Sequence, residues 1–140
     1  MHPDTLALEV VTPDRRVLSV RVRSVVLPGE LGLFGVLPGH HPFLAGLAAG
    51  PMRVRHAGGE DTFAVGGGFA EVLSDRVSVL VSSCERAADI DVERARGALD
   101  RAEKALRARG PAAEAGREEA RGDRQRARAR LRVAGRRASG

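Results

Sequence analysis

The spacing of apolar residues changes once along this chain, and that change limits the folds it can adopt. Through residues 5–82 apolar side chains alternate with polar ones, as in Leu18-Ser19-Val20-Arg21-Val22, which is the period of a half-buried β-strand. From Asp91 onward they recur at intervals of three and four, which is the period of one helix face. The sequence therefore predicts an α+β fold in sequence order, with strands first and helices second.

The N-terminal part consists of short alternating runs separated by turn residues. Pro13-Asp14, Pro28-Gly29 and Ser74-Asp75 interrupt the runs, and strands at a spacing of roughly 8–12 residues are typical of an all-β sandwich or barrel. No helical period precedes residue 85, so no crossover helix is available to join parallel strands. We expect an antiparallel β-sandwich over residues 1–86.

The C-terminal part predicts an antiparallel two-helix hairpin over residues 87–140. Asp91 is the expected N-cap of the first helix, and Gly110-Pro111 ends that helix and starts the next. The second helix, expected over residues 112–134, has mostly small residues on its apolar face: Ala113, Gly116, Ala120, Ala127, Leu131 and Ala134. Because small side chains bury little area, we expect the hairpin to be attached to the sandwich only marginally.

Charge is distributed unevenly between the two parts. Residues 1–93 hold 8 basic and 12 acidic side chains, whereas residues 94–140 hold 15 basic and 6 acidic ones. A basic C-terminal part favours an anionic partner: a nucleotide, a nucleic acid, a membrane or an acidic protein surface. The chain has four Phe and no Trp or Tyr, so base stacking is poorly supported. A small β-barrel that binds nucleic acid with a basic tail is therefore the alternative, not the main interpretation.

Residue types that support catalysis or metal binding are scarce. Cys84 is the only cysteine, so we interpret it as a small buried apolar side chain. His40 and His41 are adjacent, and adjacent strand residues point to opposite faces, so we expect no metal site there. The glycines do not form a phosphate-binding loop, and no nucleophile–base arrangement is evident. The sequence predicts a protein that is not an enzyme.

Residues 27–44 are rich in glycine, proline and leucine, and they carry one carboxylate, Glu30. One interpretation is a turn-rich β connection. A more specific interpretation is an exposed, rigid, largely apolar loop that forms a docking surface.

Three short segments have a specific residue order. Gly35 to Pro42 reads Gly-Val-Leu-Pro-Gly-His-His-Pro, and Gly67 to Val72 reads Gly-Gly-Phe-Ala-Glu-Val. Glu85-Arg86-Ala87 precedes a third segment, in which Ile90 to Ala95 reads Ile-Asp-Val-Glu-Arg-Ala. Each segment is similar to a signature of one family, and the three occur in that family's order. The chain thus resembles the epsilon subunit of F-type ATP synthases along essentially its whole length.

The resemblance implies a non-catalytic central-stalk subunit that couples ion flow to ATP synthesis. It implies that the sandwich binds the gamma subunit and that a loop faces the c-ring of the membrane sector. The residues implied at the ring are Glu30, Gly35, Val36, Leu37, Pro38, Gly39, His40 and Pro42. In relatives an acidic residue often stands two positions before Gly35, where this chain has Leu33. The implied location is the cytoplasmic face of the bacterial cell membrane, reached only through the complex.

Some bacterial relatives bind ATP in the folded hairpin, so the resemblance implies ATP as an optional regulatory ligand and no required cofactor. The matching residues are Glu85, Ile90, Asp91, Arg94, Ala95 and Arg101. If the hairpin turn holds no insertion, Arg124 and Arg128 match as well. The chemistry is sensible, because guanidinium groups bind phosphates through charge-assisted hydrogen bonds and a carboxylate accepts from ribose or an amine.

A stripe of like charge follows the second predicted helix. It consists of Arg117, Arg121, Arg124, Arg128 and Arg132. Like charges at a spacing of four destabilise a helix, which favours an anionic partner in at least one state over a merely solvated face. The resemblance implies that this arm extends toward the beta and alpha subunits and inhibits ATP hydrolysis. We expect a two-state hairpin, either folded on the sandwich or extended.

Overall fold

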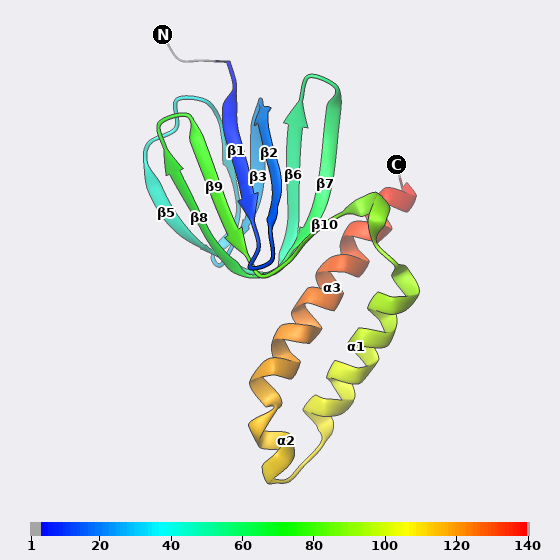
Figure 1. Ribbon diagram of the computed structural model, residues 1–140. Helices are drawn as coiled ribbons and strands as arrows, with labels where there is room; N and C mark the ends of the chain where they lie inside the picture. Colours follow the sequence, from blue (N-terminus) through cyan, green and yellow to red (C-terminus); the bar gives the residue numbers. More distant parts are fainter. Residues whose placement is uncertain (1–3, 140) are drawn as a thin grey trace.

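The computed structural model describes residues 4–139, and the side chains of residues 4–135. A β-sandwich forms one end of the molecule and a helical hairpin projects from it (Figure 1). The predicted fold class is confirmed. The ends of the ranges assigned to the two parts, residues 1–3 and 140, lie outside the described residues.

Ten strands build the sandwich. They are β1 Leu6–Val11, β2 Arg16–Val22, β3 Ser24–Gly29, β4 Gly32–Val36, β5 Phe43–Leu47, β6 Gly50–His56, β7 Gly59–Val65, β8 Gly68–Leu73, β9 Arg76–Val81 and β10 Cys84–Arg86. Their order is β10-β7-β6-β3-β5-β8-β9-β1-β2, with β4 paired to β3 alone. All pairs are antiparallel except β1 with β9, so the expectation of purely antiparallel pairing is wrong at that pair. The intervening strands themselves provide the long connection that parallel pairing requires.

One face of each strand fills the core. In β1 the side chains of Leu6, Leu8 and Val10 are buried, and their neighbours are half-buried. The alternation seen in the sequence is therefore the alternation between core and surface. Close backbone contact also restricts the first residue of β8, because a Cβ on Gly68 would overlap the carbonyl of Leu80. Glycine is required at that position for steric reasons.

The segment expected as a docking loop is mostly strand. Residues 32–36 form β4, which pairs with β3, and residues 43–47 form β5. These strands are difficult to predict because glycine and proline interrupt the alternation of apolar and polar residues. The backbone pairing that stabilises the strands leaves no periodicity in the side chains. The loop interpretation holds only for residues 37–42, between β4 and β5.

The C-terminal part contains a 3₁₀ turn, η1 Ala87–Asp89, followed by α1 Val92–Arg107, α2 Pro111–Ala115 and α3 Arg117–Ser139. Asp91 caps α1 as predicted, since its carboxylate accepts from the Arg94 N–H at 3.0 Å. Gly110, with a φ of +107°, makes the turn between the helices. The second predicted helix is interrupted at Gly116 and extends past residue 134, because glycine is a weak helix former.

Two faces of α3 are buried. The expected apolar face is present in part: Ala120, Ala127 and Ala134 are buried and Leu131 is half-buried. Ala129 and Val133 are buried on a further face, which the sequence pattern does not reveal. Val133 and Ala134 pack with Ala64 of β7 and with Ile90. The end of α3 therefore attaches the hairpin to the sandwich.

Candidate functional site

A polar groove runs along one face of the hairpin and ends at the sandwich. It comprises two adjoining hollows of about 450 and 470 Å³, which share Ala98, Arg101 and Arg130 in their walls. Its floor consists of small side chains: Ala95, Ala98, Ala102, Ala105, Gly116 and Ala120. These small side chains bury little area between the two helices, and for the same reason they leave room for a ligand.

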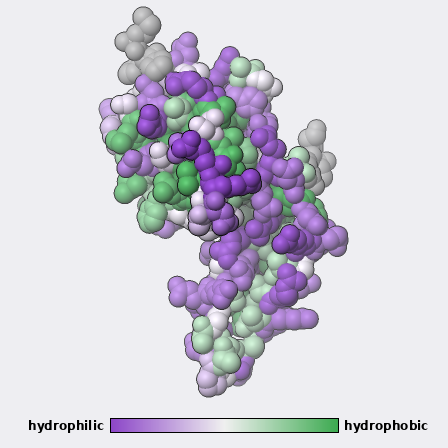
Figure 2. Space-filling model, viewed as in Figure 1, coloured by the Kyte–Doolittle hydropathy of each residue, from purple (hydrophilic) through white to green (hydrophobic). Residues whose placement is uncertain are grey.

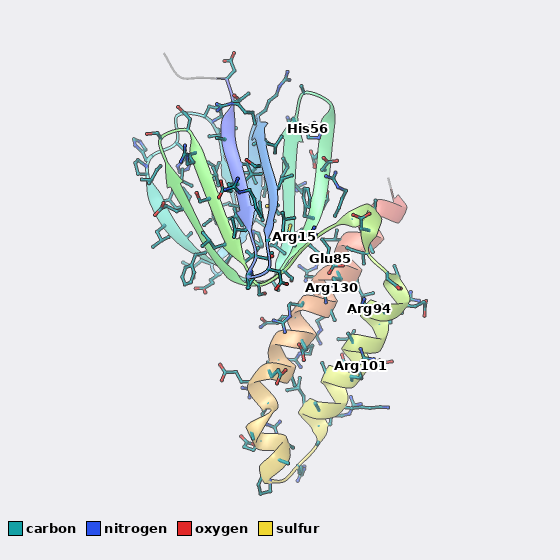
Figure 3. The ribbon with its side chains drawn as sticks, in the orientation of Figure 1. Arg15, His56, Glu85, Arg94, Arg101 and Arg130 are labelled. Atoms are coloured by element: carbon teal, nitrogen blue, oxygen red, sulfur yellow. The ribbon has the colours of Figure 1, made fainter. Side chains whose placement is uncertain are left out.

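Arginines from both helices line this groove. Arg94 and Arg101 are two helical turns apart on α1, and Arg126 and Arg130 are one turn apart on α3, so each pair shares a face. In Figure 3 Arg94 and Arg101 lie along α1, while Arg130 lies close to Glu85 where the hairpin meets the sandwich. Four guanidinium groups along one groove form a site suited to phosphate or carboxylate.

Carboxylates already pair with two of these arginines. Arg130 forms a short ion pair with Glu85 of β10, and Arg126 pairs with Asp123 at 2.6 Å. The Glu85 and Arg130 side chains are 35% and 28% exposed, so their ion pair is shielded more than a surface pair and contributes more. It also joins the sandwich to α3. An anionic ligand in the groove would compete with both carboxylates.

The structure brings most of the predicted nucleotide-site residues together, but not all of them. Glu85, Asp91, Arg94, Ala95 and Arg101 line the groove. Ile90 does not line the groove, and it packs instead with Val133 of α3.

Arg124 and Arg128 do not line the groove; Arg126 and Arg130 do. The expected match along the second helix is therefore displaced by two residues, consistent with a longer hairpin turn. Arginines flank both sides of Ala127 in the sequence, and the periodicity alone does not tell which side faces the groove.

The arginine stripe is not uniformly free. Arg117 donates to the carbonyls of Leu106 at 2.8 Å and Ala108 at 3.2 Å, and it pairs with Glu114 at 3.2 Å. It thereby caps the C-terminal end of α1, whose last carbonyls have no partner within the helix. Arg128 lies 3.8 Å from Glu103 of α1.

The other three members of the stripe differ in exposure. Arg121 and Arg132 are exposed, and Arg124 is half-buried with an Nε that has no hydrogen-bond partner among the described residues. Free arginines for an anionic partner are thus fewer in the folded hairpin than the sequence stripe indicated.

The residues implied at the membrane ring do not form one surface: Val36 is fully buried in the core, and the others do not lie at the same end of the sandwich. Glu30 lies in the tight turn between β3 and β4, with its N–H donating to the Gly46 carbonyl at 3.0 Å. Residues 37–42 follow the opposite end of β4. The turn at Glu30 lies at the hairpin end of the sandwich, and residues 37–42 lie at the far end (Figure 1). The single ring-facing loop expected from the sequence is therefore two separate surfaces.

Large apolar side chains are exposed on the part of the sheet made by β5, β8 and β9. They are Leu44, Phe69, Leu73 and Leu80. Phe69 is paired with Leu80 across β8 and β9, and with Gly46 of β5. Figure 2 shows hydrophobic surface gathered on the sandwich, whereas the visible face of the hairpin is mostly hydrophilic. The hairpin packs on β6 and β7, so it leaves this apolar face uncovered.

The single cysteine of the chain is not a reactive thiol in the folded protein. Burial raises the pKa of the Cys84 thiol to about 11, which keeps it protonated and unreactive near neutral pH. Among residues 4–139, no cluster of three His, Cys, Asp or Glu side chains is arranged to hold a metal ion. No helix in the described part of the chain is both long and apolar enough to span a membrane.

Two family models match nearly all of the chain. Residues 5–87 match the β-sandwich domain of the ATP synthase delta/epsilon chain, and residues 88–135 match the long α-helix domain of the same chain. A curated ATP synthase epsilon chain from Nitratidesulfovibrio vulgaris is 53% identical over 102 residues, covering 73% of this chain and 76% of that one. One from Geotalea uraniireducens is 47% identical over 108 residues, covering 77% and 78%.

A solved structure has the same fold. A chain of the Euglena gracilis mitochondrial ATP synthase, in a structure of its OSCP, F1 and c-ring, superposes with a TM-score of 0.78 at 23% identity. The match covers 99% of this chain and 83% of the other. Fold, residue motifs and bacterial relatives agree that this chain belongs to the delta/epsilon family of ATP synthase subunits.

Proposed function

We propose that this chain is the epsilon subunit of a bacterial F-type ATP synthase, with a fixed body that binds the rotating stalk and an arm that restrains ATP hydrolysis. The observation that carries the proposal is the unequal attachment of its two parts. The sandwich has a continuous core of large aliphatic side chains. The hairpin is attached by one small cluster, in which Ala64, Ile90, Val133 and Ala134 are buried and Ala87 and Val92 are partly buried, and by the Glu85–Arg130 ion pair.

The uncovered apolar face is the proposed site for the gamma subunit. Exposed apolar patches of this kind mark protein interfaces, and this one lies on strands that the hairpin does not cover. The turn at Glu30, with exposed Leu31 and Leu33 beside it, is the proposed contact with the c-ring. Leucine in place of a carboxylate makes that contact apolar. The chain would reach the cytoplasmic face of the membrane only through these partners.

Release of the hairpin should require less free energy than unfolding of the sandwich, whose core is larger. Burial stabilises by about 0.8 kcal/mol per CH₂ group, and the attachment consists mainly of Val133, Ala134, Ala64 and Ile90. A ligand present at a hundred times its Kd shifts an equilibrium by about 2.7 kcal/mol. Binding of a nucleotide would shift the population toward the folded form, and binding of beta and alpha subunits would shift it toward the extended form.

ATP is the proposed regulatory ligand of the groove. Arg94, Arg101, Arg126 and Arg130 would hold its phosphates, and Asp91 would accept from ribose or the base amine. Binding would have to displace Glu85 from Arg130 and Asp123 from Arg126, which lowers affinity.

The arm is tested by deleting residues 88–140 in the assembled complex. We expect ATP hydrolysis to rise while assembly with the gamma subunit is preserved, because the uncovered face lies wholly in the sandwich. Unchanged hydrolysis in a complex that assembles normally would exclude an inhibitory arm.

The nucleotide site is tested by calorimetry of the full chain with ATP. Arg126→Ala should weaken binding by roughly tenfold, the effect of losing one hydrogen bond to a charged group. Arg128→Ala is the matched control, because Arg128 lies on the same helix but is part of neither hollow. Equal losses in the two variants would place the phosphates elsewhere.

A further inference from the structure

The end of the sandwich opposite the hairpin carries a compact turn at residues 37–40. The His40 N–H donates to the Leu37 carbonyl at 3.1 Å, Pro38 is second in the turn, and Gly39 is third with a φ of +83°. This is the geometry of a type II turn, for which proline and glycine are the preferred residues. The Leu37 side chain is 62% exposed, so the turn presents a leucine to solvent.

A carboxylate from a distant part of the chain holds this turn. The Gly39 N–H donates to Asp75 Oδ1 at 3.0 Å. Asp75 lies in the two-residue turn between β8 and β9, and its own carbonyl accepts from the Ala7 N–H at 2.7 Å. Ser74, beside it, is the only non-glycine residue with positive φ in the described chain. Asp75 thus joins the turn to β1 and to the β8–β9 hairpin.

Aromatic contacts fix the other side of the same segment. The His40 ring lies 4.9 Å from the Phe43 ring, which in turn meets Phe34 edge-on at 5.4 Å. Among the described residues, Asp75 is the one side chain outside residues 37–42 that hydrogen-bonds to them. Because Gly39 is exposed, its N–H would be hydrated without Asp75. The Gly39–Asp75 hydrogen bond therefore orders the turn and does not compensate for a buried group. Ordering a binding segment in advance raises its affinity for a partner.

The turn continues the apolar face proposed above for the gamma subunit. Exposed Leu73 directly precedes the β8–β9 turn, and exposed Leu44 lies on the adjoining strand β5. The Gly39–Asp75 hydrogen bond joins the turn that carries Leu37 to the turn after Leu73. We propose that Asp75 is a positioning residue: it holds the Leu37–His40 turn so that Leu37 extends the surface that binds the gamma subunit. This inference rests on the proposed function.

The experiment measures the affinity of the full chain for the purified gamma subunit. Asp75→Ala should weaken binding by roughly tenfold, the effect of one lost charge-assisted hydrogen bond. Asp75→Asn keeps an oxygen that accepts from Gly39, so it should restore affinity. Leu37→Ala should weaken binding to a similar extent. In the double variant the loss should not exceed that of Leu37→Ala alone, because Asp75 acts through Leu37.

Four other results would contradict parts of the proposal, and they are distinguishable. If the wild-type chain does not bind the gamma subunit, the proposed function fails. If Leu37→Ala weakens binding and Asp75→Ala does not, the positioning role fails while the docking surface stands. If the losses add in the double variant, or if Asp75→Asn fails to restore affinity although its melting temperature is normal, Asp75 acts by another route and the proposal is overturned.

Discussion

The sandwich and the hairpin are built from different kinds of buried residue. The sandwich core contains fully buried Leu6, Leu27, Met52 and many valines. In the hairpin the residues buried along α1 and between the helices are alanines, such as Ala95, Ala102 and Ala127. Since stabilisation scales with the apolar area removed from water, we expect the sandwich to be the more rigid part and the hairpin to rearrange more readily. The same small residues also open the groove that arginines line.

The sharpest way to test this contrast is to truncate one core residue of the sandwich. Leu27→Ala should lower the free energy of unfolding by about 2–5 kcal/mol, the range for buried leucines, measured by urea denaturation of the isolated chain. Leu33→Ala, on the neighbouring strand but 56% exposed, should change it by less than about 0.5 kcal/mol. Similar losses in the two variants would mean that the sandwich is not the stable part.

A second change should act on the hairpin alone. Glu85→Gln removes the ion pair with Arg130, and loss of a partly shielded charged hydrogen bond costs about 1–3 kcal/mol. Hydrogen exchange should accelerate along α3 but not in β1 or β9. Glu103→Gln is the control, because the Glu103 carboxylate lies 3.8 Å or more from Arg107 and Arg128 and contributes little. Faster exchange throughout the sandwich would show that the two parts unfold together.

These two regions also differ in how much their sequence revealed. Strong alternation in β1, β2 and β9 predicted the sandwich, and the N-cap at Asp91 predicted the start of α1, because both depend on local spacing. The sequence does not predict strand β4, because its stabilisation comes from pairing with β3, and this pairing produces no alternation of apolar and polar residues. The parallel β1–β9 pair was missed for the same reason.

The candidate site was predictable only where it is local. Glu85 to Arg101 surround one helix start, and the residues that the family motif named there line the groove, except Ile90. Arg126 and Arg130 depend on the length of the turn around Gly110 and on which flank of Ala127 faces α1. The bond between Gly39 and Asp75 joins residues far apart in sequence. No periodicity encodes such contacts.

A third change tests whether the hairpin is closed by an arginine that the sequence had placed in the stripe. Arg117→Lys keeps the charge but loses the fork that reaches the Leu106 and Ala108 carbonyls. We expect the hairpin to lose about 1 kcal/mol, seen as faster exchange at the end of α1. In the complex this change should lower ATP hydrolysis by favouring the extended arm, whereas deletion of the arm raises it. Exposed Arg121→Lys should do neither, and the same effect there would mean that charge, not capping, is responsible.

The smallest expected effect concerns pH. Burial raises the pKa of the Cys84 thiol from 9.0 to about 11, so the folded state holds the thiol proton more tightly than the unfolded state. The resulting stability is fully present below pH 9 and is lost as pH rises toward 11. The chain has no Tyr and a single lysine, exposed Lys104, so few other groups titrate in that window. The free energy of unfolding of the wild type should fall between pH 9 and 11, and Cys84→Ala should flatten the profile; a parallel decline in both proteins would show that Cys84 is not its cause.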